Sequence, residues 1–269
     1  MDTKNTNPQR VEPVHDDGHG GLTFEVVEKQ IEADGAHTVS RGVYLVPNMI
    51  TTLSLLSGFF SILSSMQGDF YKAALAIFLS AILDGMDGRV ARMLNAQSPF
   101  GEQFDSLADM LAFGVAPAIL MYSYALQPLG RVGIALAFVF TACAAFRLAR
   151  FNVQINVVDK KYFIGLASPL AALLVTSFVV VSLDYSLLQN YGTSMIALSA
   201  LWVVICGLLM VSNVKYYSFK EFDRQRVPFW VLILGVVVLA AAIYDIPMGV
   251  LVIGTCYALS GFYTSFTAK

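Results

Sequence analysis

The chain has 269 residues, of which 57% are hydrophobic and 13% are charged. Soluble domains usually carry about 25% charged residues, so this composition argues against a soluble protein. The net charge is −2, and we expect no nucleic-acid partner.

Residues 1–41 are predicted to form a polar cytoplasmic tail that is partly disordered, because they combine prolines with the "DDGHGG" cluster. Within the tail, "LTFEVVEKQIEA" (22–33) fits either a short amphipathic helix at the membrane surface or an extended segment. No basic segment followed by an apolar stretch begins the chain, so we predict no signal peptide. Residues 42–269 are expected to form the transmembrane domain.

From Val43 onward the chain consists of apolar blocks of about 20 residues, the length that a helix needs to cross a bilayer. A block such as "VPFWVLILGVVVLAAAIY" has no polar face, whereas a helix of a soluble bundle would have one. We therefore predict an all-α, polytopic membrane protein with about eight transmembrane helices. The expected spans are about 47–66, 70–93, 99–125, 130–151, 163–183, 191–211, 228–244 and 247–266.

Lysine and arginine are concentrated before the first span and in the loops after the fourth and sixth spans. By the positive-inside rule, these loops and both termini should face the cytoplasm. The short "NAQSPF" loop between the second and third spans then lies on the same side. The basic residues in question are Lys4, Arg10, Lys29, Arg41, Arg147, Arg150, Lys160, Lys161, Lys215, Lys220, Arg224 and Arg226.

The second and third spans hold an unusual concentration of charge, in "LDGMDGRVARMLNAQSPFGEQFDSLADM". A helix turns by about 100° per residue, so Asp84 and Asp87 share a face, as do Asp105 and Asp109. Counted at about 1.5 Å per residue from the centre of the loop, Asp84 matches Asp109 in depth, and Asp87 matches Asp105. Two adjacent antiparallel helices would place these four carboxylates on facing sides.

An aspartate at the centre of a membrane helix costs roughly 2.5–3.5 kcal/mol, and Arg89 and Arg92 could neutralise at most two of the four. One or two divalent cations would offset the rest, since carboxylate oxygens suit Mg²⁺, Mn²⁺ or Ca²⁺. Gly88 and Gly101 remove side chains beside the carboxylates and would let a bulky ligand approach. Two alternatives stay open from spacing alone: an ion-paired helix interface, and a pathway for cations or protons.

The same stretch resembles the signature of the CDP-alcohol phosphotransferases: D-x-x-D-G-x-x-A-R, eight residues, then G-x-x-x-D-x-x-x-D. Every defined position is matched, from Asp84 to Asp109. The resemblance implies the CDP-alcohol phosphotransferase fold over roughly residues 43–266, and a centre of two divalent metal ions, Mg²⁺ or Mn²⁺. It implies Asp84, Asp87, Asp105 and Asp109 as metal ligands, with Asp109 also the general base. Together with a resemblance of "PNMIT" to the family's P-N-x-x-T element, it implies CDP contacts for Asn48, Thr51, Gly88, Arg92 and Ser98.

Two later segments, "FRLARFNVQIN" and "YFIGLASPLAA", resemble elements of the bacterial integral-membrane phosphatidylserine synthases. This implies transfer of the phosphatidyl group from CDP-diacylglycerol to L-serine, with release of CMP. Arg147, Arg150 and Asn152 would bind the acceptor, because arginine offers a planar fork of donors to a carboxylate. Ordinary positive-inside anchoring is the alternative for the two arginines. One departure is Ala167, where many members have proline.

The resemblance also implies a multi-pass protein of the inner (cytoplasmic) membrane of a bacterium, surrounded by membrane lipids and forming a homodimer, with its active site facing the cytoplasm. Glycerol-3-phosphate, inositol phosphate and choline remain alternative acceptors. The rival of another class is a divalent-cation transporter, which would place acids or broken helices in several spans, often as an internal repeat. The chain shows no second copy of the pattern. A catalytically dead scaffold would have lost an aspartate, and none is lost.

Overall fold

The computed structural model describes residues 45–94, 98–154, 162–217 and 245–267, all within one compact unit formed by residues 37–269. The predicted tail, with its possible amphipathic helix, and the predicted seventh span (228–244) lie outside the described residues.

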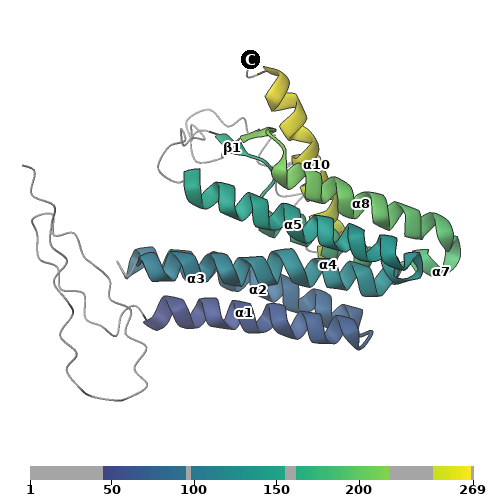
Figure 1. Cartoon of the computed structure of the whole chain (residues 1–269), viewed down its shortest axis with the longest axis horizontal. Helices are drawn as coiled ribbons and strands as arrows, with labels where there is room; N and C mark the ends of the chain where they lie inside the picture. Colours follow the sequence, from purple (N-terminus) through teal and green to yellow (C-terminus); the bar gives the residue numbers. More distant parts are fainter. Residues whose placement is uncertain (1–44, 95–97, 155–161, 218–244, 268–269) are drawn as a thin grey trace, which may run out of the picture. The chain divides into compact units, whose positions relative to one another are not determined.

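Helices α1 (Leu45–Met66) and α2 (Phe70–Met93) form a hairpin and pack along each other (Figure 1). The tight turn between them uses Gly68, whose φ of 81° lies in the left-handed region that glycine adopts without strain. Small side chains fill the interface, among them the buried Ser57, Ala73 and Ala76. Small residues let membrane helices approach closely, which explains the tight pairing.

The third predicted span is one continuous helical rod whose geometry changes along its length. It begins as a regular α-helix, widens twice into π-helical turns and ends in a 3₁₀ turn. Gly58 of α1 lies against the first π turn, and a Cβ at this position would come within 2.9 Å of the Ala112 Cα. Glycine at position 58 therefore permits the close contact of α1 with the rod. The parts are α3 (Pro99–Asp109), η1 (Met110–Val115), α4 (Ala116–Met121), η2 (Tyr122–Leu126) and η3 (Gln127–Leu129).

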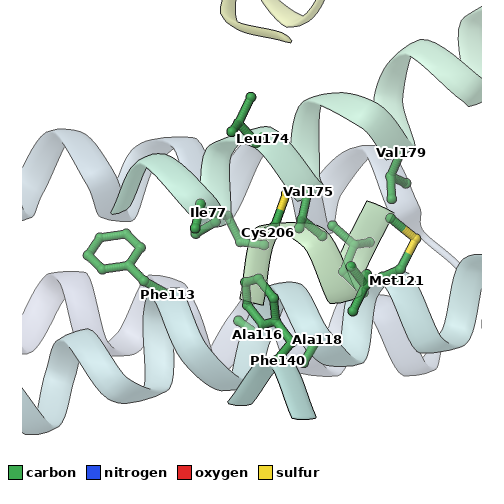
Figure 2. Close-up of a cluster of buried hydrophobic side chains, with 14 of the residues drawn as sticks. Ile77, Phe113, Ala116, Ala118, Met121, Phe140, Leu174, Val175, Val179 and Cys206 are labelled. Carbon is green, nitrogen blue, oxygen red and sulfur yellow. The ribbon is translucent and has the colours of Figure 1, made fainter. Parts of the chain in front are cut away.

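Helices α5, α6 and α8 pack against this rod. Helix α5 contacts η1 and runs along α8, while α6 contacts α2, α4, α8 and α10. Figure 2 shows part of the shared interior, to which Phe113, Phe140 and Leu174 all contribute; each is almost completely buried. The bounds are α5 (Arg131–Gln154), α6 (Ser168–Asp184), α7 (Leu187–Tyr191), α8 (Thr193–Val211) and α10 (Ile246–Thr267).

A short antiparallel sheet interrupts the helical architecture. Strand β1 (Tyr162–Ile164) pairs with β2 (Lys215–Tyr217), with Ile164 opposite Lys215. Gly165 follows β1 with a φ of 79°, and α6 begins only at Ser168. The prediction of a membrane span from residue 163 was therefore wrong at its start, because a strand and a glycine turn precede the helix.

The prediction of an almost wholly helical, polytopic membrane protein is confirmed. Among the described residues, four helical segments are long and apolar enough to cross a membrane: Leu45–Met66, Pro99–Leu129, Arg131–Val153 and Thr193–Val211. Ser168–Asp184 and Ile246–Gly261 are shorter apolar helices. Helix α2 has 24 residues, enough to span, but its second half carries the charges on which the site depends.

Candidate metal and nucleotide site

The start of α3 fixes the position of its acids. Ser98 is the N-cap, and its hydroxyl accepts a hydrogen bond from the Gly101 backbone N–H at 3.0 Å. Pro99 occupies the first turn, where a missing N–H costs nothing. The helix therefore begins at a defined residue, which sets the direction in which Asp105 and Asp109 point.

Three of the four predicted metal ligands form a compact cluster. Carboxylate oxygens of Asp84, Asp105 and Asp109 all lie within 4.8 Å of one another, and the three side chains are partly buried. In the described part of the chain, no basic side chain forms an ion pair with any of them. Like charges this close repel strongly away from bulk water. A hard divalent cation fits this donor set, because it is built of carboxylate oxygens alone.

Asp87, the fourth predicted ligand, is anchored separately. Its side chain is 4% exposed, and its Oδ2 accepts a hydrogen bond from the Thr51 hydroxyl at 2.7 Å. The Gly88 backbone N–H donates to Oδ1 at 2.5 Å. These contacts tie α1 to α2 and hold the Asp87 carboxylate in one orientation. Asp87 faces the neighbouring cavity together with Asp105.

That cavity has a volume of about 160 Å³. All five residues predicted to contact CDP line it: Asn48, Thr51, Gly88, Arg92 and Ser98. Ligand pockets usually measure at least about 300 Å³, so this cavity could enclose only part of a nucleoside diphosphate.

The two glycines beside the carboxylates play different parts. A Cβ at Gly88 would meet nothing within 4 Å, which agrees with the expectation that this side is open to a ligand. A Cβ at Gly101 would lie 3.3 Å from the Asn48 Oδ1 and from the Ser98 Oγ. Glycine at position 101 therefore keeps α3 close to the start of α1.

Sequence reasoning missed some of the lining. Glu102, Pro47 and Ala91 also border the cavity. Pro47 and Ala91 lie within the two sequence motifs, whereas Glu102 was not singled out as a site residue. Its position directly after Gly101, one turn beyond Ser98, was the signal that could have placed it at the site.

The residues predicted to bind the acceptor do not form one group. The Arg147 Nη1 donates to the Ser168 hydroxyl at 2.8 Å, and the guanidinium lies 5.9 Å from the centroid of the Phe151 ring. Its buried Nε has no hydrogen-bond partner among the described residues. Of the three predicted acceptor residues, Arg147 is thus the one with a buried donor that has no protein partner.

Arg150 is engaged by the backbone. Its Nη2 donates to the Ile164 carbonyl at 3.0 Å, and its Nη1 donates to the Val211 carbonyl at 3.1 Å. Further carbonyls of Met210 and Ser212 lie within 3.4 Å of Nη2. Basic side chains commonly satisfy the last carbonyls of a helix, so these contacts favour an anchoring role at the end of α8.

Asn152 reaches a different neighbour. Its Nδ2 donates to the Ser106 hydroxyl at 3.0 Å, which links α5 to α3 one residue after Asp105. Ser106 was not singled out from the sequence.

Comparisons with known proteins identify the family. Residues 44–211 match the family described as CDP-alcohol phosphatidyltransferase. A protein of Helicobacter pylori named CDP-diacylglycerol–serine O-phosphatidyltransferase is 42% identical over 192 residues, which cover 71% of this chain and 79% of the relative.

Two more distant relatives carry the same name. The protein of Bacillus subtilis is 37% identical over 67% of this chain and 94% of its own length. The protein of the archaeon Methanocaldococcus jannaschii is 33% identical over 82% of this chain and 94% of its own length. With its acid cluster, its cavity and these similarities, the chain belongs to the CDP-alcohol phosphatidyltransferase family.

Proposed function

We propose that this protein transfers the phosphatidyl group of CDP-diacylglycerol to the hydroxyl of L-serine, giving phosphatidylserine and CMP. The observation that carries the proposal is the acid cluster directly beside a cavity lined by all five residues expected to contact CDP. The relatives named for this reaction support serine as the acceptor.

We propose that the site binds two divalent ions, Mg²⁺ or Mn²⁺. Asp84, Asp105 and Asp109 would supply ligands from the cluster, and Asp87 would supply one from the cavity side. When bound, such ions offset the charge of a pyrophosphate and stabilise the attacking and leaving oxygens of a displacement.

The protein's own residues position the lipid nucleotide. Arg92 and Ser98 border the cavity and would donate hydrogen bonds to the CDP group, while the open side at Gly88 admits it. Asn48 and Thr51 would contact the nucleotide from α1. With the nucleotide held there, the acyl chains can remain in the bilayer.

Asp109 is the proposed general base. It would take the proton from the serine hydroxyl as the hydroxyl oxygen bonds to the phosphorus that carries the diacylglycerol. The bond from that phosphorus to the bridging oxygen breaks, and the bridging oxygen leaves with CMP. The proton ends on Asp109, and the products are phosphatidylserine and CMP.

Arg147 is the proposed partner of the serine carboxylate. Helix α5, which carries Arg147, contacts η1 directly after Asp109, and the buried Nε of Arg147 has no hydrogen-bond partner among the described residues. Both observations support this assignment, because the hydroxyl and the carboxylate of serine are only two carbon atoms apart. For Arg150 and Asn152, acceptor contact stays a prediction. Their hydrogen bonds to backbone carbonyls and to Ser106 support a role in holding the surrounding helices.

The cellular setting is also part of the proposal. The basic loops predict a site that faces the cytoplasm from the inner membrane of a bacterium. We further propose that the protein forms a homodimer. Residues 1–41 would form a cytoplasmic tail, and residues 42–269 the catalytic domain.

Release of CMP tests the proposal directly. The purified protein in detergent, with CDP-diacylglycerol and Mg²⁺ or Mn²⁺, should release CMP when L-serine is added. Glycerol-3-phosphate, inositol phosphate and choline serve as competing acceptors. CMP release with one of these and not with serine would overturn the acceptor, whereas no release with any alcohol would overturn the reaction.

A further inference from the structure

The Arg147 guanidinium is held on one side only. Its Nη1 donates to the Ser168 hydroxyl at 2.8 Å, while its buried Nε has no hydrogen-bond partner. Within the described residues, its Nη2 makes no hydrogen bond and the side chain makes no ion pair. A buried cation with unused donors is costly, so an anionic partner would stabilise it.

The geometry of the guanidinium decides which edge is available. Arginine binds a carboxylate best through two parallel N–H donors. The contact with Ser168 occupies Nη1, on the side of the group next to Cδ. The edge formed by Nε and Nη2 has two parallel donors, and neither makes a hydrogen bond within the described residues.

Ser168 is placed to fix this orientation. It is the first residue of α6, is fully buried, and follows the turn at Gly165 that ends β1. Its backbone therefore has little freedom, and its hydroxyl oxygen stays at a defined point beside α5. A flexible arginine held at Nη1 loses less entropy when a ligand binds to its other edge.

We propose that Ser168 is a positioning residue that turns the Nε–Nη2 edge of Arg147 toward the carboxylate of the acceptor. This inference rests on the proposed function and deepens it, since it explains how the site would distinguish serine from amino alcohols that lack a carboxylate. Asp109 would then meet the hydroxyl of the same molecule, and Arg147 its carboxylate.

The test compares two acceptors that differ only at the carboxyl group. L-Serine and L-serinamide share the hydroxyl and the amine, but only serine has the carboxylate. We expect Ser168→Ala to raise the KM for serine about tenfold, the usual effect of losing a hydrogen bond to a charged group, with kcat changed less. The kinetics with serinamide should stay the same, so the preference for serine falls by the same factor.

Two further variants make the result specific. Ser168→Cys nearly keeps the volume but weakens the acceptor, and should reduce the preference for serine even if the alanine variant does not fold. Ser177→Ala is the matched control, because Ser177 is equally buried in α6 and its hydroxyl has no partner. It should leave the preference unchanged.

The outcomes separate the inference from the function that it rests on. If the wild-type protein uses serine but Ser168→Cys keeps the full preference over serinamide, the positioning role is wrong and the proposed function stands. An equal loss with both acceptors would also overturn it, since that marks a general structural effect. If the wild-type protein does not use serine at all, the proposed function fails and the inference fails with it.

Discussion

The polar side chains in the two halves of α2 have different kinds of partner. In the first half, the hydroxyls of Ser54 and Ser80 lie 2.7 Å apart, and Ser57 donates to the Ala76 carbonyl at 2.7 Å. In the second half, the Asp84 carboxylate meets two other carboxylates and, among the described residues, no basic partner. Both halves bond to α1, the first through Ser80 and Ala76 and the second through Asp87, but only the second half also carries an acid of the cluster.

The difference shows how to separate structural from functional polarity inside a membrane. A hydroxyl that finds a partner in the protein contributes to helix packing, and it needs nothing else. A group of acids without a cationic partner is costly, and such residues mark ligand or ion sites. Changes at the acid cluster, at the cavity and at the packed serines test this division.

Removal of divalent metal should have the largest effect. Chelation with EDTA should reduce CMP release to background, because the acid cluster would then be left with uncompensated charge. Addition of Mg²⁺ or Mn²⁺ in excess should restore activity. Turnover that survives complete chelation would show that the second half of α2 does not serve a metal.

Asp109→Asn should lower kcat by about 10²–10⁴-fold, the usual contribution of a general base. The protein should still fold, since the change removes a charge from a crowded cluster. Stopped assays of CMP release would measure the effect. Asp69→Asn is the control, because Asp69 pairs with Lys72 at an exposed turn. Near-normal kcat in Asp109→Asn would contradict the assignment of the base.

Gly101→Ala should raise the KM for CDP-diacylglycerol by about tenfold, the scale of one misplaced methyl group in a binding pocket. The added Cβ would press on Asn48 and Ser98, both of which line the cavity. Gly85→Ala is the matched control, because a Cβ at that position meets nothing within 4 Å. Equal behaviour of the two variants would argue against the tight contact.

Ser54→Ala should have the smallest effect. It should lower the free energy of unfolding by about 0.6 kcal/mol, the mean value of a hydrogen bond between membrane helices. The kcat/KM should not change. Thr52→Ala serves for comparison, since Thr52 is exposed and donates only to the Asn48 carbonyl of its own helix. A clear drop in kcat/KM for Ser54→Ala would contradict a purely structural role for the first half of α2.

The helices next to the site were predictable because their signals are local. The predicted span 70–93 coincides with α2, and the third span begins at residue 99 as expected. The Ser-Pro start of α3 and the helical spacing of the aspartates depend only on neighbouring residues. The convergence of Asp84, Asp105 and Asp109 follows once the two helices lie side by side.

Other features depend on distant contacts, and the sequence could not reveal them. The matched depths of Asp84 with Asp109 and of Asp87 with Asp105 agree with the cluster and with the cavity lining, but they could not show that Asp105 belongs to both. The bond from Thr51 sets the orientation of Asp87, and it joins residues 36 positions apart. The contacts of Arg150 with the end of α8 likewise need the tertiary structure, since about 60 residues separate the partners.

The π turn at η1 lies directly after Asp109. A π turn holds more residues than an α turn, so it shifts the angular phase of everything that follows. The rod can thus direct its acids toward α2 and, beyond η1, direct Ala116 and Leu120 into the interior. Deletion of one residue within η1 would restore a regular helix. It would rotate Asp105 and Asp109 about the helix axis relative to the part of the rod that follows η1. A one-residue deletion there would therefore uncouple catalysis from packing although no side chain of the site had been altered.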